Sequence, residues 1–325
     1  MIRTSTPTTP RPPGRRRGIS LAQREAIWAY VFLLVPLLFF ATVRFWPAIQ
    51  AFRLSLFTWH VNPANRDFIA LDHYRALLAD PSFGLAIRNT LLYTVITVPA
   101  SIALGLGISI MLQAVVFGRG WFRAIYFAPY ITPAVAVAWV WGWMYNVNFG
   151  IFNGAIISWW EFAERVGLPD WLIIDPQRFL RDPDRALYYV AIVIIWQQLG
   201  FQVVIFLAGL QGIPRVYYEA ARIDGANPWQ LFRHVTVPLL NPVLVFAVVI
   251  TTIYALQLFD QIVNINFTDQ GGPLGRTASI ALFMYQEAFR SFDMGRAAAV
   301  TVVLFVLILT VTLVQLRLTQ RRVEY

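Results

Sequence analysis

The chain alternates between long apolar stretches and shorter segments rich in polar residues. Six stretches are long enough to cross a membrane: residues 27–43, 90–116, 122–145, 186–210, 243–258 with an extension toward 263, and 297–316. A helix needs about 20 mostly apolar residues to span the hydrocarbon core of a bilayer. The pattern therefore predicts an all-α membrane protein with six transmembrane helices.

The composition supports this prediction and excludes several kinds of catalytic site. Hydrophobic residues make up 58% of the chain and charged residues 13%, whereas a soluble domain carries about 25% charged residues. The sequence contains no cysteine and no lysine, which excludes disulfides, a thiolate nucleophile and the lysine of a Walker A site. Its three histidines lie outside the apolar stretches, so a histidine-rich metal centre is not expected.

The first 24 residues form a basic arm ahead of the first apolar stretch. They are rich in Thr, Pro and Arg, which favours disorder, and the arginines would attract anionic lipid headgroups. The stretch is followed by Arg44-Phe-Trp-Pro47 rather than by a small-residue cleavage site, so we expect a retained helix. The expected division is a disordered arm over residues 1–24 and a membrane domain over residues 25–325.

The distribution of arginine predicts the orientation in the membrane. With six spans, both termini and the loop over residues 211–238 share one side, which carries 14 arginines and four acidic residues. The opposite side carries 12 of each. Cytoplasmic loops are enriched in basic residues, so both termini and this loop are expected to be cytoplasmic. No compact basic domain exists to bind nucleic acid.

Two of the outer segments have the periodicity of surface helices. Residues 72–80 and 159–166 combine helical spacing with aromatic side chains. Such helices are suited to the membrane–water interface.

The loop over residues 211–238 predicts two short helices joined by a turn. Gly225 is able to take the left-handed conformation that closes the first helix. Asn227, Pro228 and Gln230 have the spacing of a capping box at the start of the second helix. Pro238 and Pro242 are expected to stop that helix before the fifth span begins. Any polar hairpin between two spans needs such caps, so the capping pattern alone leaves the role of the loop open.

The spacing of this loop resembles a family signature. Glu219-Ala220-Ala221, then Gly225, then Val235-Thr236-Val237-Pro238 is similar to the cytoplasmic loop of the membrane subunits of ABC importers, with Val in place of the usual Ile and Leu. Further segments resemble the sugar-importer branch of the maltose and glycerol-phosphate type: Leu71 to Pro81 with Asn89-Thr90, Phe127 to Pro133 with Phe149-Gly150 and Asn153, Asp224-Gly225-Ala226, and Thr268 to Pro273 with Thr277. The resemblance covers residues 71–295.

The resemblance implies a fold, a location and a set of partners. The fold would be a type I ABC importer transmembrane domain of the MetI-like class, in a bacterial inner membrane. The partners would be a second homologous permease subunit, two ATPase subunits, an extracytoplasmic substrate-binding protein and membrane lipid. ATP and magnesium would bind to the ATPase subunits, so no cofactor is expected in this chain. A non-catalytic pore subunit for carbohydrate uptake is the function implied.

The same resemblance assigns roles within the loop. The helix over residues 219–224 would be the coupling helix that docks into a groove of the ATPase subunit. Glu219 would be the charged anchor, Ala220 and Ala221 the close-contact surface, and Gly225 the bend. Asp224 and Pro238 complete the expected coupling residues.

Polar and aromatic residues in the middle spans are candidates for the substrate path. They are Gln197, Gln198, Phe201 and Gln202 in the fourth span, Thr251, Tyr254 and Gln257 in the fifth, and Tyr130, which matches a family tyrosine facing the path. Amide, phenol and ring groups suit a neutral polyol. The same groups also join helices by hydrogen bonds, so each has two interpretations at this point. In some family members only one of the two permease subunits holds the substrate.

Asp260, placed by the pattern inside the fifth span, also has two interpretations. A buried carboxylate is typical of a proton relay, which would indicate a proton-coupled secondary carrier. The family often has Phe-Asp here, as in Phe259-Asp260, which indicates a structural or gating role near the outer end. The loop over residues 268–277 is either a simple turn or part of the surface that receives the binding protein.

The substrate remains a choice between two classes. The interiors of the predicted spans contain no arginine, which favours a neutral saccharide. Glycerol-3-phosphate or a glycerophosphodiester is the alternative, although it would require a cationic site. A secondary carrier would need paired buried charges, and spans two, three, four and six have none in their interiors.

Overall fold

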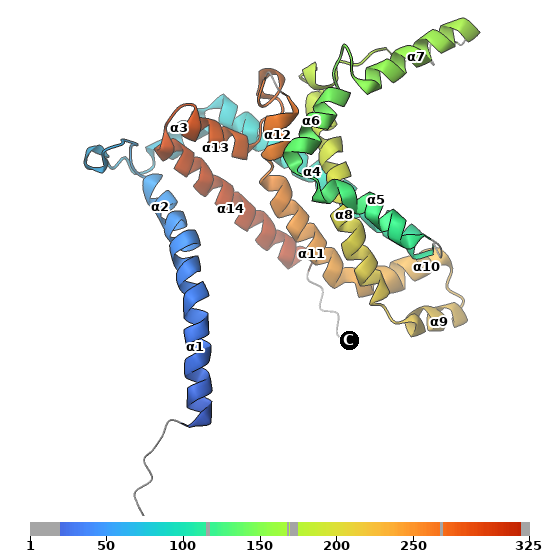
Figure 1. Cartoon of the computed structure of the whole chain (residues 1–325), viewed down its shortest axis with the longest axis horizontal. Helices are drawn as coiled ribbons and strands as arrows, with labels where there is room; N and C mark the ends of the chain where they lie inside the picture. Colours follow the sequence, from blue (N-terminus) through green and yellow to red (C-terminus); the bar gives the residue numbers. More distant parts are fainter. Residues whose placement is uncertain (1–19, 115–117, 168, 170–174, 267–268, 320–325) are drawn as a thin grey trace, which may run out of the picture. The chain divides into compact units, whose positions relative to one another are not determined.

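The computed structural model describes residues 20–114, 118–167, 169, 175–266 and 269–319 (Figure 1). It divides the chain into two compact units, Met1–Ala51 and Phe52–Tyr325, which are described separately below. The basic arm expected over residues 1–24 lies almost entirely outside the described residues. The described residues are helical apart from turns and one isolated β-bridge between Phe57 and Phe68.

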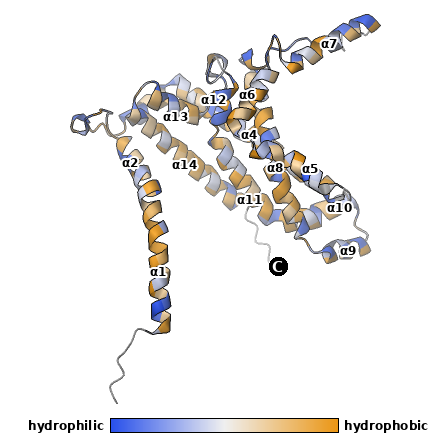
Figure 2. Cartoon of the chain, viewed as in Figure 1, coloured by the Kyte–Doolittle hydropathy of each residue, from blue (hydrophilic) through white to orange (hydrophobic). Residues whose placement is uncertain are grey.

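The first unit is a long apolar helix. Helix α1 (Leu21–Phe40) begins with a capping box between Ser20 and Gln23, and a π turn (Ala41–Phe45) joins it to α2 (Trp46–Leu54). Figure 2 shows that α1 is hydrophobic along most of its length. None of its side chains is buried. The predicted span at 27–43 is therefore confirmed and extended at both ends.

Three spans of the second unit closely follow the sequence prediction. They are α4 (Pro81–Ala114), α8 (Ala186–Gln211) and α14 (Met294–Thr319). The main difference is that α4 begins at Pro81 rather than near residue 90. The short helices expected over 72–80 and 159–166 are also present, as α3 (Asp72–Ala79) and α7 (Ile151–Val166).

The third apolar stretch is a broken span, and the prediction of one continuous helix was wrong. Helix α5 (Arg119–Ile131) and α6 (Ala134–Met144) meet at an angle of 95°. Pro133 restricts the residue before it, and Thr132 accordingly has extended backbone angles. Counting the bent pair as one span gives the expected six among the described residues.

The fifth span differs from the prediction at both ends. Helix α10 (Pro228–Leu231) continues through a π turn, η5 (Phe232–Thr236), into α11 (Val237–Leu256), so Pro238 and Pro242 do not stop it. The Thr236 hydroxyl donates to the Leu231 carbonyl at 3.3 Å. Prolines are tolerated inside membrane helices where neighbouring groups and local π turns satisfy the freed backbone groups.

The expected extension of the fifth span is instead a separate helix. Helix α11 ends at Leu256, and α12 (Asp260–Ile265) follows after an irregular Phe259. Asp260 is therefore exposed in the first turn of α12 and does not lie inside the span. The other short elements of this unit are α9 (Arg215–Ile223), α13 (Ile280–Phe289) and the 3₁₀ turns Pro63–Asn65, Phe179–Arg181 and Pro273–Gly275.

The core of the second unit is built on the crossing of α4 and α8. The Cβ and Cγ atoms of Gln202 lie against Gly105, where a Cβ atom would overlap them. The Ser109 hydroxyl crosses to the Val203 carbonyl at 3.1 Å. Small residues allow the two backbones to come close. In lipid there is no hydrophobic driving force between helices, so this close packing and the interhelical hydrogen bonds hold them together.

This crossing predicts opposite effects for two neighbouring glycines. Gly105→Ala should destabilise the protein by about 1–3 kcal/mol, because the added methyl group overlaps Gln202. Gly107→Ala is the matched control: nothing lies within 4 Å of its added methyl group, so stability should be unchanged or higher. Melting temperatures of the purified variants in detergent measure both effects, and equal melting temperatures would contradict the close crossing.

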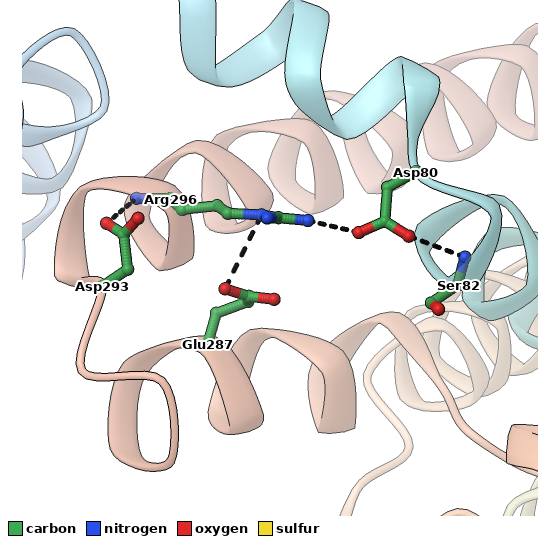
Figure 3. A network of polar contacts seen from close by, with 5 residues as sticks. All are labelled: Asp80, Ser82, Glu287, Asp293 and Arg296. Atoms are coloured by element: carbon green, nitrogen blue, oxygen red, sulfur yellow. Dashed lines mark hydrogen bonds and ion pairs between the residues drawn. The ribbon is translucent and has the colours of Figure 1, made fainter.

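An ion-pair network joins the start of α4 to α13 and α14 (Figure 3). The Arg296 guanidinium pairs with Asp80 and lies with its Nε atom 3.6 Å from Glu287 Oε2. Asp80 also accepts a hydrogen bond from the Ser82 backbone N–H at 2.8 Å. Burial raises the pKa of the Glu287 carboxyl, and Arg296 opposes that rise. One cation therefore serves two carboxylates from different elements.

Removing the cation should destabilise the protein in a pH-dependent way. We expect Arg296→Gln to cost about 1–3 kcal/mol, between the values for exposed and buried pairs. Without the cation the pKa of Glu287 should rise further, so the cost should be larger at pH 8 than at pH 5, where the carboxyl is more readily protonated. Thermal unfolding at the two pH values measures this, with Arg75→Gln, in an exposed pair, as control. A pH-independent cost would argue against the network.

Candidate functional site

Helix α9 and the turn after it form a rigid, exposed hairpin. The Ala226 N–H donates to the Ala221 carbonyl at 2.9 Å and the Gly225 N–H to the Arg222 carbonyl at 3.0 Å, the two bonds of a Schellman motif. Gly225 has a φ of 82°, as the sequence predicted, so a side chain at this position would be strained. The turn is thus fixed by its own hydrogen bonds.

The capping box predicted for the second helix is confirmed. The Gln230 N–H donates to the Asn227 side chain at 2.9 Å, and the Asn227 N–H donates to the Gln230 side chain at 2.8 Å. Beyond it, the Tyr218 hydroxyl lies 3.1 Å from the Thr236 hydroxyl in the π turn. The hairpin is therefore tied directly to the helix that becomes the fifth span.

The surface of α9 has a charged face and an apolar face, and both are accessible. Glu219, Ala220, Asp224 and Gly225 are exposed, and Ala221 is half-buried. Ala221 and Gly225 line a shallow hollow of about 330 Å³ with Asp224, Ala226, Gln230, His234 and Val235. Pro238, the last of the expected coupling residues, lies in α11 rather than in the hairpin.

Sequence reasoning missed the apolar half of this surface. Val216, Tyr217 and Ile223 are exposed on α9, Ile223 to 85%, and Trp229 follows on α10. At 100° per residue these three α9 side chains share one arc with Ala220 and Ala221, while Arg215, Glu219 and Arg222 occupy the other. Helical periodicity over residues 215–223 would have revealed them.

The polar residues of the middle spans form a buried seam between helices. The Gln197 side-chain amide donates to the Thr132 carbonyl at 3.2 Å, at the break between α5 and α6. The Gln261 amide donates to the Gln197 side-chain oxygen at 2.9 Å and to the Tyr254 hydroxyl at 2.5 Å. Gln261, which the sequence did not single out as a candidate, therefore links α8, α11 and α12.

A second part of the seam lies one turn further along α8. The Gln202 amide donates to the Thr251 hydroxyl at 2.5 Å, and this hydroxyl donates to the Ala247 carbonyl at 2.6 Å. Gln197, Gln198, Gln202 and Thr251 are all buried. The bonds that link Gln197 to Thr132 and Gln261, and Gln202 to Thr251, hold α8 against its neighbours.

The remaining path candidates are accessible. Tyr130 is 39% exposed, Gln257 is exposed, and Phe201 and Tyr254 are half-buried. The rings of Tyr130 and Phe201 lie 5.4 Å apart, which brings α5 and α8 together around an aromatic pair. The eight candidates thus separate into four that are buried and four that are exposed or half-buried, of which Tyr254 also joins helices through its bond from Gln261.

Comparison with known proteins agrees with this geometry. Residues 98–324 match the family described as binding-protein-dependent transport system inner membrane component. The chain is 32% identical over 301 residues to the trehalose/maltose transport system permease protein MalF of Thermococcus litoralis, covering 91% of this chain and 95% of that one. It is 32% identical over 282 residues to the sn-glycerol-3-phosphate transport system permease protein UgpA of Agrobacterium fabrum, covering 86% and 90%.

A solved structure has the same fold. It is a chain of a bacterial ABC transporter involved in the import of the acidic polysaccharide alginate, with a TM-score of 0.76 and 21% sequence identity, covering 93% of this chain and 98% of that one. The predicted all-α fold, a MetI-like transmembrane domain of a type I ABC importer, is confirmed.

The division of the eight candidates predicts different outcomes for two glutamines. Gln202→Ala should destabilise the protein by about 1–2 kcal/mol, because it removes an interhelical bond and leaves Thr251 without its buried partner. Gln257→Ala, which truncates an exposed side chain, should leave stability unchanged. Melting temperatures compare the two, and equal losses would contradict the division.

Proposed function

The chain belongs to the family of binding-protein-dependent transport system inner membrane components, and we propose that it is the non-catalytic pore subunit of an ABC importer for a carbohydrate. The observation that carries the proposal is the hairpin around Gly225, whose apolar face is exposed although its backbone is fully fixed. A rigid, exposed apolar surface of this kind is typical of a protein interface.

The proposed partner at this surface is an ATPase subunit. Ile223, Val216 and Tyr217 would enter an apolar groove, and Ala220 and Ala221 would let the partner's backbone come close. Glu219 and Asp224 would fix the register by pairing with charges at the rim. The two ATPase subunits would bind ATP and magnesium, and a second homologous permease would complete the pore.

The proposed path of force runs from the hairpin into the membrane. Tyr218 connects α9 to the π turn through Thr236, and the helix then continues without a break through α10, η5 and α11 to Leu256. Thr251 on this helix bonds to Gln202 of α8, and Tyr254 is linked to Gln197 of α8 through Gln261. Movement of the hairpin would therefore alter the seam beside the accessible path residues.

The accessible path residues support a neutral carbohydrate. Tyr130 and Phe201 offer ring faces on which a sugar can stack, and Gln257 and Tyr254 offer uncharged hydrogen-bonding groups. Asp260 is exposed and directly precedes Gln261, whose amide binds the Tyr254 hydroxyl. A carboxylate in this position disfavours a phosphorylated substrate such as glycerol-3-phosphate, the alternative suggested by the relative UgpA.

The position of Asp260 also disfavours a proton-coupled secondary carrier. It is exposed in α12, outside the long spans. Helices α4, α8, α11 and α14 contain no acidic residue at all. The proposed orientation places both termini in the cytoplasm of a bacterium, in line with the arginine bias, and an extracytoplasmic binding protein would deliver the sugar from the opposite side.

The transport proposal is tested by reconstitution of the complete importer in vesicles. We expect ATP-dependent uptake of labelled maltose or trehalose in the presence of the binding protein, and no uptake of labelled glycerol-3-phosphate. Uptake without ATPase subunits would overturn the proposal, and uptake of glycerol-3-phosphate would favour the alternative substrate.

The docking proposal is tested at Ala221. Ala221→Trp should reduce uptake and substrate-stimulated ATPase activity by at least tenfold, because the bulky ring prevents close approach at the hollow. The melting temperature should change little, because Ala221 is only half-buried and the hairpin around it is exposed. Ala76→Trp, on the exposed face of α3, is the matched control and should transport normally. Normal coupling in the Ala221 variant would rule out this docking surface.

A further inference from the structure

The turn between α12 and α13 is held to α4 by hydrogen bonds over a long sequence separation. The buried Asn89 amide donates to the carbonyls of Gly275 and Ala278 at 3.1 and 3.0 Å. The Tyr93 hydroxyl donates to the Thr277 carbonyl at 3.2 Å. The Thr90 hydroxyl accepts a hydrogen bond from the Ile280 N–H at 2.9 Å. The turn is therefore a rigid part of the fold. Residue 268, where the sequence predicts this loop to begin, lies outside the described residues.

This rigid turn displays one strained and highly exposed apolar residue. Leu274 has a φ of 56°, a left-handed conformation that is unfavourable for a branched side chain, and it is 79% exposed. The Leu274 side chain is therefore mostly free of packing contacts within this chain. Strain maintained by the surrounding structure is often associated with a binding role.

Beside the turn lies a small hollow with two arginines. Arg88 of α4 and Arg276 of the turn line it with Asn89, Leu92, Pro183, Asp184, Leu187 and Tyr188, around a volume of about 70 Å³. Among the described residues neither arginine forms an ion pair within 4.0 Å, although Asp184 lines the same hollow. Two guanidinium groups and one carboxylate leave the hollow with a net positive charge.

The size of the hollow limits what it could hold. Sites for small molecules usually enclose about 300–1,000 Å³, so a sugar unit would not fit into 70 Å³. One carboxylate side chain would fit, and guanidinium groups bind carboxylates through two parallel hydrogen bonds. Tyr188, which is 53% exposed, provides apolar surface in the lining, and the exposed Leu274 lies two positions before Arg276 in the same turn. Arginine and tyrosine with a water-excluding surround are typical of an interface hot spot.

We propose that this arginine hollow receives an aspartate or glutamate side chain of the extracytoplasmic binding protein, with Leu274 as the adjoining apolar contact. The proposal rests on the proposed function, which supplies such a partner on this side of the membrane. The hydrogen bonds from α4 would hold Arg276 and Leu274 in position before the partner arrives, so that little ordering cost is paid on docking.

The test measures how tightly the importer's extracytoplasmic binding protein binds to the assembled importer in lipid nanodiscs. Arg88→Glu and Arg276→Glu should each raise the dissociation constant at least tenfold, and the double variant should bind least. Arg75→Glu, on the exposed face of α3, is the matched control and should bind normally. Basal ATPase activity, measured without the binding protein, should be unchanged in all variants. A charge-reversed acidic residue on the binding protein should restore affinity for Arg276→Glu.

The outcomes separate this inference from the proposed function. If the unaltered importer binds the binding protein and both arginine variants bind it equally well, the arginine hollow is not the docking site, while the transport function stands. If the unaltered importer shows neither binding nor stimulated ATPase activity, the proposed function itself fails. Weakened binding that no charge reversal on the binding protein restores would overturn a direct carboxylate contact.

Discussion

Backbone carbonyls freed inside a bilayer must find partners within the protein, because lipid offers none. The Gln197 amide meets this requirement at the break between α5 and α6, where it donates to the Thr132 carbonyl. Gln197 is in turn bound by Gln261 of α12, and Gln261 by Tyr254 of α11. The bend between α5 and α6 is thus linked through one chain of hydrogen bonds to α8, α11 and α12.

Features that depend on nearest neighbours could be predicted from the sequence. The capping box at Asn227 and the left-handed Gly225 follow from residues within three positions of each other, and the apolar stretches follow from hydropathy alone. The effect of the prolines was predicted wrongly at two places: a continuous helix was expected across Pro133, and a helix end was expected at Pro238. At Pro133 the span breaks, and Gln197, 64 positions further along the chain, satisfies the Thr132 carbonyl at the break, whereas the helix continues through Pro238 after a π turn. Neither outcome can be read from residues close in sequence.

The candidate site shows the same limit. The sequence identifies the polar residues of the fourth and fifth spans but does not show which of them face one another. Only the packing of α8 against α11 places Gln202 on Thr251 and leaves Gln257 exposed. The apolar arc of α9 could have been predicted from the helical periodicity of its sequence. The proximity of Arg88 and Arg276 could not, because the two residues are 188 positions apart and meet only through the folding of the turn onto α4.

Residues Pro228 to Leu256 form one continuous helix that can move as a single rod. At 1.5 Å per residue its 29 residues reach about 43 Å. A tilt of about 10° around the midpoint of this helix would displace each of its ends by about 4 Å. Because the helix runs through both prolines without ending, a modest displacement at one surface of the bilayer would be carried along it toward the other.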